Sequence, residues 1–183
     1  MDESNTLTIM PKKFTTFQNV CFYFLVYSFI GWIMECLYAI ILLGHFVNRG
    51  FLSGPLCPIY GSGALILIFM LSKHKKNAVK LFTVSAIAFS LLEYIVSFCL
   101  EVLFRAKFWD YTNDFLNLNG RISIAYSFAW GIMAILFLDR IHPFVEKKLK
   151  NISYNKKLWF INIGMSLFIL DSFITILFKL NVL

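Results

Sequence analysis

The stretch Val79–Phe104 reads VKLFTVSAIAFSLLEYIVSFCLEVLF, and it decides the class of fold. A helix that crosses a bilayer needs about 20 mostly apolar residues, and this run satisfies that requirement. Its apolar residues form a continuous run and do not alternate with polar ones, which favours a helix over a barrel strand. The sequence therefore predicts an all-α membrane protein.

Four further apolar segments accompany this run, at about Val20–Leu43, Pro58–Ser72, Ile122–Leu138 and Leu158–Leu180. The composition agrees, because 59% of the residues are hydrophobic and 15% are charged, whereas a soluble domain carries about 25% charged residues. We expect a polytopic helix bundle with about five transmembrane helices. It forms one domain over residues 17–183, preceded by a polar, cytoplasmic N-terminal tail over residues 1–16.

The positive charges predict the orientation of these helices. Most Lys and Arg residues lie in the N-terminal tail and in the connections after the second and fourth segments. Because cytoplasmic loops carry an excess of these residues, we expect a cytoplasmic N-terminus and an external C-terminus in a bacterial cell membrane. The net charge of +7 then reflects orientation and contact with membrane lipids, and no nucleic acid partner is expected.

The second segment is preceded by an unusual stretch, RGFLSGPLCPIYG at residues 49–61. Pro55 and Pro58 cannot both lie inside one continuous helix, yet the stretch is too apolar for a solvated loop. We expect a Pro/Gly-broken, re-entrant segment that enters the protein from outside and begins a short helix near Pro58. An ordinary apolar loop at the membrane interface remains an alternative.

Four acidic residues interrupt the apolar segments: Glu35, Glu93, Glu101 and Asp171. A charged side chain at the centre of a membrane helix costs roughly 2.5–3.5 kcal/mol. At about 100° per residue, Glu35 shares a sector with small and polar neighbours, as do Glu93 and Glu101 on their own helix. The members of these two stripes are Ser28, Gly31, Glu35 and Tyr38, and Ser90, Glu93, Ser97 and Glu101. Such stripes predict faces that point into the bundle.

Depth places three of these acids on the external side, where arginines from two connections can meet them. An Arg guanidinium binds a carboxylate through two parallel hydrogen bonds, which lowers the cost of burying both charges. We therefore predict an outward-facing site for a substrate, an ion or a lipid head group, while structural locking of the helices remains the alternative. Its candidate residues are Glu35, Arg49, Glu93, Glu101, Asp110, Asn119 and Arg121.

Several other chemistries have no sequence support. The chain contains no G-x-x-x-x-G-K-[ST] phosphate loop and no HExxH motif, and its four cysteines form no CxxC pair. We therefore expect no metal and no cofactor, and the sequence favours a protein that is not itself an enzyme.

The polar motifs also carry a family resemblance over roughly residues 22–131. They include Val47–Phe51, Gly54–Gly61, Phe108–Tyr111 and Asn117–Ile122. In these motifs the chain resembles the bacterial membrane family labelled "putative ABC-transporter type IV", the CmpB-like family. The resemblance implies a permease subunit that works with a separate ATPase subunit or as a homo-oligomer.

Our first hypothesis is thus a transporter-like protein of the plasma membrane, with the acidic and arginine residues at its site. Two alternatives remain open. One is a membrane enzyme that acts on a lipid-linked substrate, with the acids as general acid and base. The other is a non-catalytic membrane subunit with a regulatory or interaction role.

Overall fold

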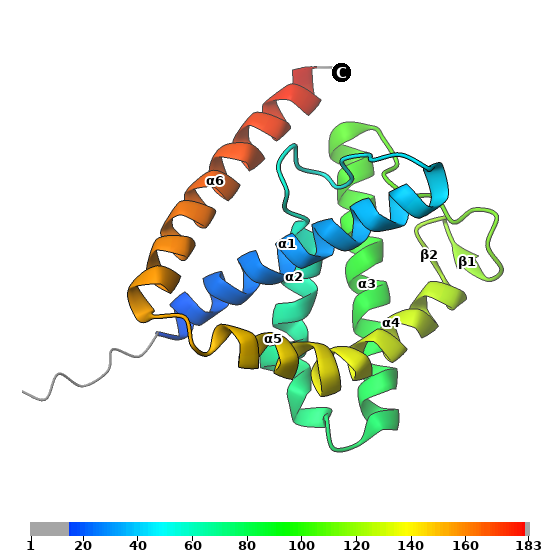
Figure 1. Cartoon of the computed structure of the whole chain (residues 1–183). Coiled ribbons are helices and arrows are strands. Elements are labelled where there is room, and N and C mark those ends of the chain that lie inside the picture. Colours follow the sequence, from blue (N-terminus) through cyan, green and yellow to red (C-terminus); the bar gives the residue numbers. More distant parts are fainter. Residues whose placement is uncertain (1–14, 182–183) are drawn as a thin grey trace, which may run out of the picture.

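The structure is a computed structural model that describes residues 15–181 of the chain, and nearly all of the predicted N-terminal tail lies outside these residues. The α-helices are α1 (Thr16–Leu43), α2 (Pro58–Leu65), α3 (Ala78–Phe104), α4 (Ile124–Leu136), α5 (His142–Leu149) and α6 (Tyr154–Asn181) (Figure 1). Shorter helical pieces extend them, namely η1 (Ile66–Leu71), η2 (Ser72–His74) and η3 (Phe137–Ile141). Two antiparallel strands of two residues each, β1 (Asn117–Leu118) and β2 (Ile122–Ser123), precede α4. The predicted all-α class is confirmed.

Four helical stretches are long and apolar enough to cross a membrane: Thr16–Leu43, Ala78–Phe104, Ile124–Leu149 and Tyr154–Leu180. The chain is therefore a multi-pass membrane protein. The remaining predicted segment is also helical, since α2, η1 and η2 follow one another from Pro58 to His74. At 1.5 Å per residue this run covers about 25 Å, less than the hydrocarbon core of about 30 Å. The fifth predicted crossing thus depends on the shortest of the five segments.

The connection between α1 and α2 is irregular, as its proline and glycine content predicts. No regular helix or strand is assigned from Gly44 to Cys57, and α2 begins at Pro58, where a proline costs no hydrogen bond. The segment is nevertheless packed against the bundle, because Leu52 and Cys57 are buried. The Cys57 backbone N–H donates to the Ser28 carbonyl oxygen at 3.0 Å.

Two glycines allow α1 and α2 to approach closely. A Cβ atom added at Gly31 would overlap the Tyr60 side chain, and one added at Gly61 would lie 2.6 Å from the Phe24 carbonyl oxygen. Helices in membranes associate through such small residues, because their backbones can then come into van der Waals contact. This contact fixes Tyr60 beside the polar face of α1.

A second pair of helices, α3 and α4, packs through polar as well as apolar groups. The Ser90 hydroxyl donates to the Ser127 hydroxyl at 2.6 Å, and the rings of Phe89 and Trp130 lie 5.7 Å apart. The predicted inward face of α3 is confirmed, since Ser90, Glu93 and Ser97 are all buried.

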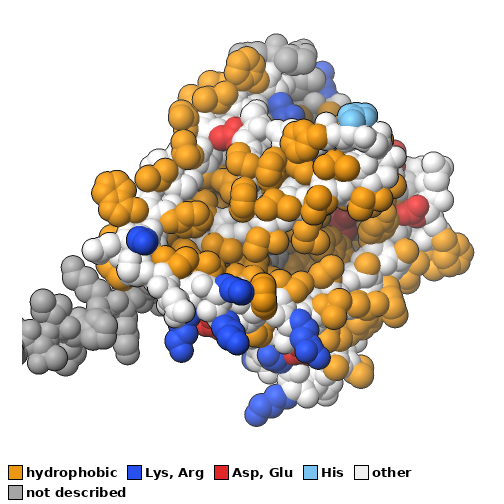
Figure 2. Space-filling view, viewed as in Figure 1, with side chains coloured by type: hydrophobic (Ala, Val, Ile, Leu, Met, Phe, Trp, Pro, Cys, Tyr) orange, Lys and Arg blue, Asp and Glu red, His pale blue; other side chains and the backbone are white. Residues whose placement is uncertain are grey.

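The connections lie at two chemically different ends of the molecule. At one, which we call the acidic end, α1 and α3 finish and α4 starts, and it holds Glu35 and Glu101. At the other, the basic end, the α2–α3 connection and α5 carry most of the described lysines. Figure 2 shows basic side chains gathered along one lower edge and hydrophobic ones across most of the remaining visible surface. Large exposed apolar side chains of this kind suit contact with lipid.

The stretch after α4 corrects one sequence interpretation. By its charges alone, the stretch Pro143–Lys157 is interpreted as a solvated loop, with a short basic helix as the alternative. The structure contains that helix as α5, and η3 joins it to α4 without a break. Pro143 has no backbone N–H to donate, and the π-helical turn immediately before it changes the hydrogen-bonding register. The helix therefore continues past the proline.

Candidate functional site

The first acidic group at the acidic end belongs to α1. The Tyr60 hydroxyl donates to Glu35 Oε1 at 2.5 Å, and Arg49 Nε lies 3.4 Å from Glu35 Oε2. The Arg49 guanidinium also lies over the Tyr38 ring, 5.7 Å from its centroid. Both side chains of the ion pair are partly exposed, so Glu35 has a compensating charge that water can still reach.

The second acidic group, Glu93 on α3, has a different environment. Only 6% of its surface is exposed. The Tyr111 hydroxyl donates to its Oε1 at 2.9 Å, and the Trp130 indole N–H donates to its Oε2 at 2.9 Å. Both donors are uncharged, and no Lys, Arg or His among residues 15–181 lies within 4.0 Å of Glu93. This carboxyl group is therefore held by hydrogen bonds alone.

Tyr111 is the residue through which the connection after α3 reaches Glu93. It lies in the connection after α3, and its ring stacks on the Tyr126 ring at a centroid distance of 4.2 Å. Burial raises the pKa of Tyr111, and the negative charges of Glu93 and Glu35 raise it further. The phenol therefore keeps its proton and remains a donor at neutral pH. Tyr111 therefore joins the connection after α3 to Glu93 through an uncharged donor.

A third acidic group, Glu101, lies about two turns beyond Glu93 on α3. Arg121 Nη2 lies 2.6 Å from Glu101 Oε2, and the guanidinium also lies over the rings of Tyr94 and Phe98. The Arg121 Nε–H is buried and has no hydrogen-bond partner within the described part of the chain. The Arg121 carbonyl oxygen accepts a bond from the Trp109 indole at 3.0 Å.

The remaining two candidates lie in the connection between α3 and α4. Asn119 Nδ2 donates to the Tyr94 hydroxyl at 2.9 Å. Asp110 accepts hydrogen bonds from the Thr112 hydroxyl and, at 3.0 Å, from the Thr112 backbone N–H. These bonds, the hydroxyl's first, lower the pKa of the exposed Asp110 carboxyl. Asp110 and Asn119 thus stabilise the connection that carries Tyr111 and Arg121.

The structure thus pairs Glu35 with Arg49 and Glu101 with Arg121, but gives Glu93 neither arginine. Sequence reasoning missed the partners of Glu93. None of Trp130, Tyr60 and Tyr111 was among its candidate residues. The available signal was the presence of tyrosine and tryptophan, which carry both an apolar ring and a hydrogen-bond donor, within apolar segments that also hold acids.

Asp171 on α6 forms a separate contact that was only a minor candidate from sequence. Its Oδ2 accepts a bond from the Gly54 backbone N–H at 2.9 Å, and its Oδ1 accepts one from the Thr175 hydroxyl at 3.1 Å. Thr175 Oγ1 also lies 3.3 Å from the Ser53 backbone N–H, which donates to it. This group attaches the irregular segment to α6. Within residues 15–181, no three His, Cys, Asp or Glu side chains are grouped so that they could hold a metal ion.

Comparison with known families agrees with the motifs that surround these residues. The model of the family described as "Putative ABC-transporter type IV" matches residues 22–176. The chain belongs to this family. The match includes every candidate residue of the acidic end and extends through α5 into α6. No curated protein and no solved structure matches the chain.

Proposed function

We propose that this member of the type IV family is the membrane-spanning, permease-type component of a transport system. Its ion or substrate site would lie at the acidic end, with Glu93 as the binding group and Glu35 beside it. The observation that carries the proposal is the environment of Glu93, a buried carboxyl group in a membrane helix with two neutral donors and no cation within 4.0 Å among the described residues.

An uncompensated carboxylate is costly within a membrane protein, and such residues commonly mark ion or proton pathways. Glu35 and Glu101 already have arginine partners, so their charges are offset within the chain. Within residues 15–181 Glu93 has no such partner, and a bound cation or proton would offset its charge. The buried, unpaired Nε–H of Arg121 supplies a further donor at the same end, which suits an anionic or carbonyl group of a substrate.

If the chain crosses the membrane five times, the charges of its connections determine which side of the membrane the site faces. The Lys179 ammonium on α6 lies over the rings of Phe51 and Phe108, so the C-terminal half of α6 reaches the acidic end. The two connections at the basic end are rich in lysine, which favours the cytoplasm. Under this proposal α2 is the fifth crossing, the segment from Gly44 to Cys57 is re-entrant, and the acidic end faces outward. The N-terminus is then cytoplasmic and the C-terminus external.

The partner we propose is a separate ATPase subunit or a second copy of the chain. The sequence has no G-x-x-x-x-G-K-[ST] phosphate loop of its own, and five helices form a small unit for a transport pathway. A transported cation or an ATPase would supply the energy.

The test uses the full chain in proteoliposomes, with imposed gradients of protons, Na⁺ and K⁺ as separate probes. We expect flux of at least one of these ions above that of protein-free liposomes. Glu93→Gln should reduce this flux to the protein-free level, because the neutral amide has no negative charge to offset that of a cation and cannot take up a proton. Glu146→Gln is the matched control, since it makes the same substitution at an exposed position of the basic end and should keep the flux.

Three results would overturn the proposal. Unmodified protein that supports no flux but changes the lipid composition of the vesicles would favour an enzyme acting on lipid-linked substrates. A stable protein partner with neither flux nor lipid change would favour a regulatory subunit. Flux that survives Glu93→Gln in a folded protein would assign Glu93 to helix locking alone.

A further inference from the structure

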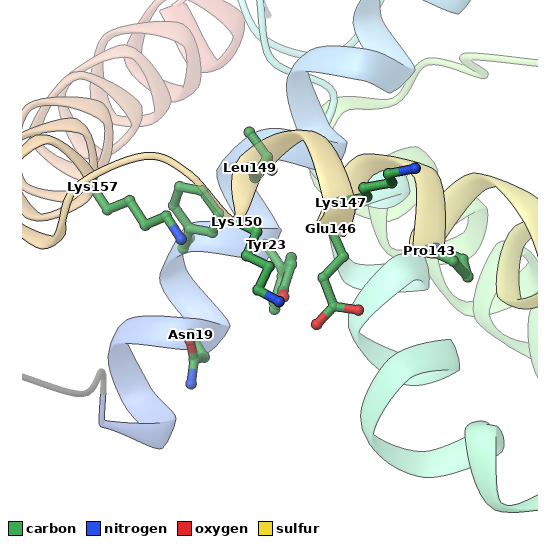
Figure 3. A pocket seen from close by; sticks show the side chains of 9 residues that line it. Asn19, Tyr23, Pro143, Glu146, Lys147, Leu149, Lys150 and Lys157 are labelled. Carbon is green, nitrogen blue, oxygen red and sulfur yellow. The ribbon is translucent and has the colours of Figure 1, made fainter. Parts of the chain in front are cut away.

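A hollow at the basic end has no role in the proposed transport site. It lies between α1, α5 and the start of α6 and has a volume of about 530 Å³. Phe22 and Tyr23 of α1 contribute aromatic rings to its lining, and lysines of α5 and α6 contribute positive charge. Figure 3 shows side chains from α1, α5 and the start of α6 around one opening.

The charge of this hollow is positive. Lys147, Lys150 and Lys157 line it together with a single acidic residue, Glu146. In Figure 3 the Lys150 and Lys157 side chains extend toward the hollow from different elements. The Lys157 ammonium also lies 5.4 Å from the centroid of the Phe22 ring. An anion in the hollow would therefore be approached by ammonium groups from both α5 and α6.

Apolar aromatic side chains lie beside the charged groups. Trp159 and Phe160 follow Lys157 on α6, and both are exposed. The ring of Phe160 packs edge-on against that of Phe22 at 5.8 Å. Exposed aromatic residues next to lysines are typical of the region where a bilayer meets water. A ligand at this place meets positive charge on one side and lipid-facing rings on the other.

We infer that the hollow binds the phosphate head group of an anionic phospholipid of the cytoplasmic leaflet. The lysines would contact the phosphate, and the acyl chains would lie along the exposed rings of Trp159 and Phe160. Basic pockets between membrane helices on the cytoplasmic side are suited to such head groups. A soluble anion would use the same lysines but would gain nothing from the exposed rings. The bound lipid would join α5 to α6 at the end opposite the Asp171 contact.

The test is native mass spectrometry of the full chain, released from nanodiscs that contain equal amounts of phosphatidylglycerol and phosphatidylcholine. We expect unmodified protein to retain phosphatidylglycerol preferentially. Lys150→Gln combined with Lys157→Gln should weaken that retention about 25-fold, because each lysine near an anionic surface contributes about a fivefold gain. The matched control is Lys73→Gln with Lys76→Gln, which removes the same charge from the α2–α3 connection and should keep the preference.

The design remains decisive if the double variant does not fold, because the comparison of the two lipids in unmodified protein stands alone. Equal retention of phosphatidylglycerol and phosphatidylcholine there would overturn the inference. So would an equal loss in the two double variants, which would indicate a diffuse basic surface. Displacement of the phosphatidylglycerol by millimolar inorganic phosphate would indicate a site for free phosphate and would also overturn it.

Discussion

Removing one hydroxyl group tests how Glu93 is held. Tyr111→Phe deletes the donor to Glu93 Oε1 at 2.9 Å but keeps the ring that stacks on Tyr126 at 4.2 Å. Packing is therefore nearly unchanged, and the cost is that of the hydrogen bond. Hydrogen bonds to charged groups contribute about 1.5–3 kcal/mol to the stability of soluble proteins. Hydrogen bonds between the helices of membrane proteins contribute about 0.6 kcal/mol on average and about 1.7 kcal/mol at most. Since Trp130 still holds the other oxygen, we expect unfolding to become easier by about 1.5 kcal/mol.

The assay is SDS-induced unfolding in mixed micelles, followed by tryptophan fluorescence. Tyr126→Phe is the control, because it removes the hydroxyl of the other ring in the same stack and should change the free energy of unfolding by less than about 0.5 kcal/mol. A double-mutant cycle of Tyr111→Phe with Glu93→Gln should give a coupling of about 1 kcal/mol. Equal effects of the two tyrosine substitutions, or a coupling near zero, would refute the reasoning.

Two further substitutions test the packing of α1 and the connection after α3. Gly61→Ala should lower the free energy of unfolding by more than about 2 kcal/mol, because the added Cβ would overlap the Ser28 hydroxyl. Gly63→Ala is the control and should cost less, since its Cβ would meet only the Phe89 ring at 3.2 Å. Equal midpoints of SDS-induced unfolding for the two variants would contradict this. Hydrogen bonds lower the pKa of Asp110, so their stabilising effect is complete above the ordinary carboxyl pKa of about 4 and disappears as the pH falls through the lowered value. Asp110→Asn should therefore speed backbone hydrogen exchange in residues 110–120 at pH 7, and this effect should shrink progressively as the pH falls below about 4. An effect that does not change with pH would be the contrary result.

The fold was largely predictable because hydrophobic runs and helix-breaking residues act locally. The predicted boundary at Phe104 and the helix start at Pro58 both agree with the structure. The inward face of α3 followed from spacing alone. The helix over His142–Leu149 was missed because its charges indicated a solvent-exposed segment. A solvent-exposed segment can still be helical.

The sequence indicated which polar residues lie at the acidic end better than it indicated which of them pair. Helix faces and depth indicated which acids share an end, but they do not determine which donor reaches which oxygen. Glu93 meets Tyr111, which is contributed by a loop whose path depends on several hydrogen bonds of its own. Such a path has no periodic pattern, so the sequence offered two arginines as partners and left out the phenol. Whether these groups bind a ligand stays a prediction.

The contact between Gly54 and Asp171 has a consequence for biogenesis. The two residues are 117 positions apart, so the Gly54 amide is synthesised long before the carboxylate that it will contact. Until the last helix has left the ribosome and entered the bilayer, the segment after α1 lacks this partner. Insertion of the first helices can thus precede their final assembly, and a chain truncated before α6 would expose an incompletely bonded segment to membrane quality control.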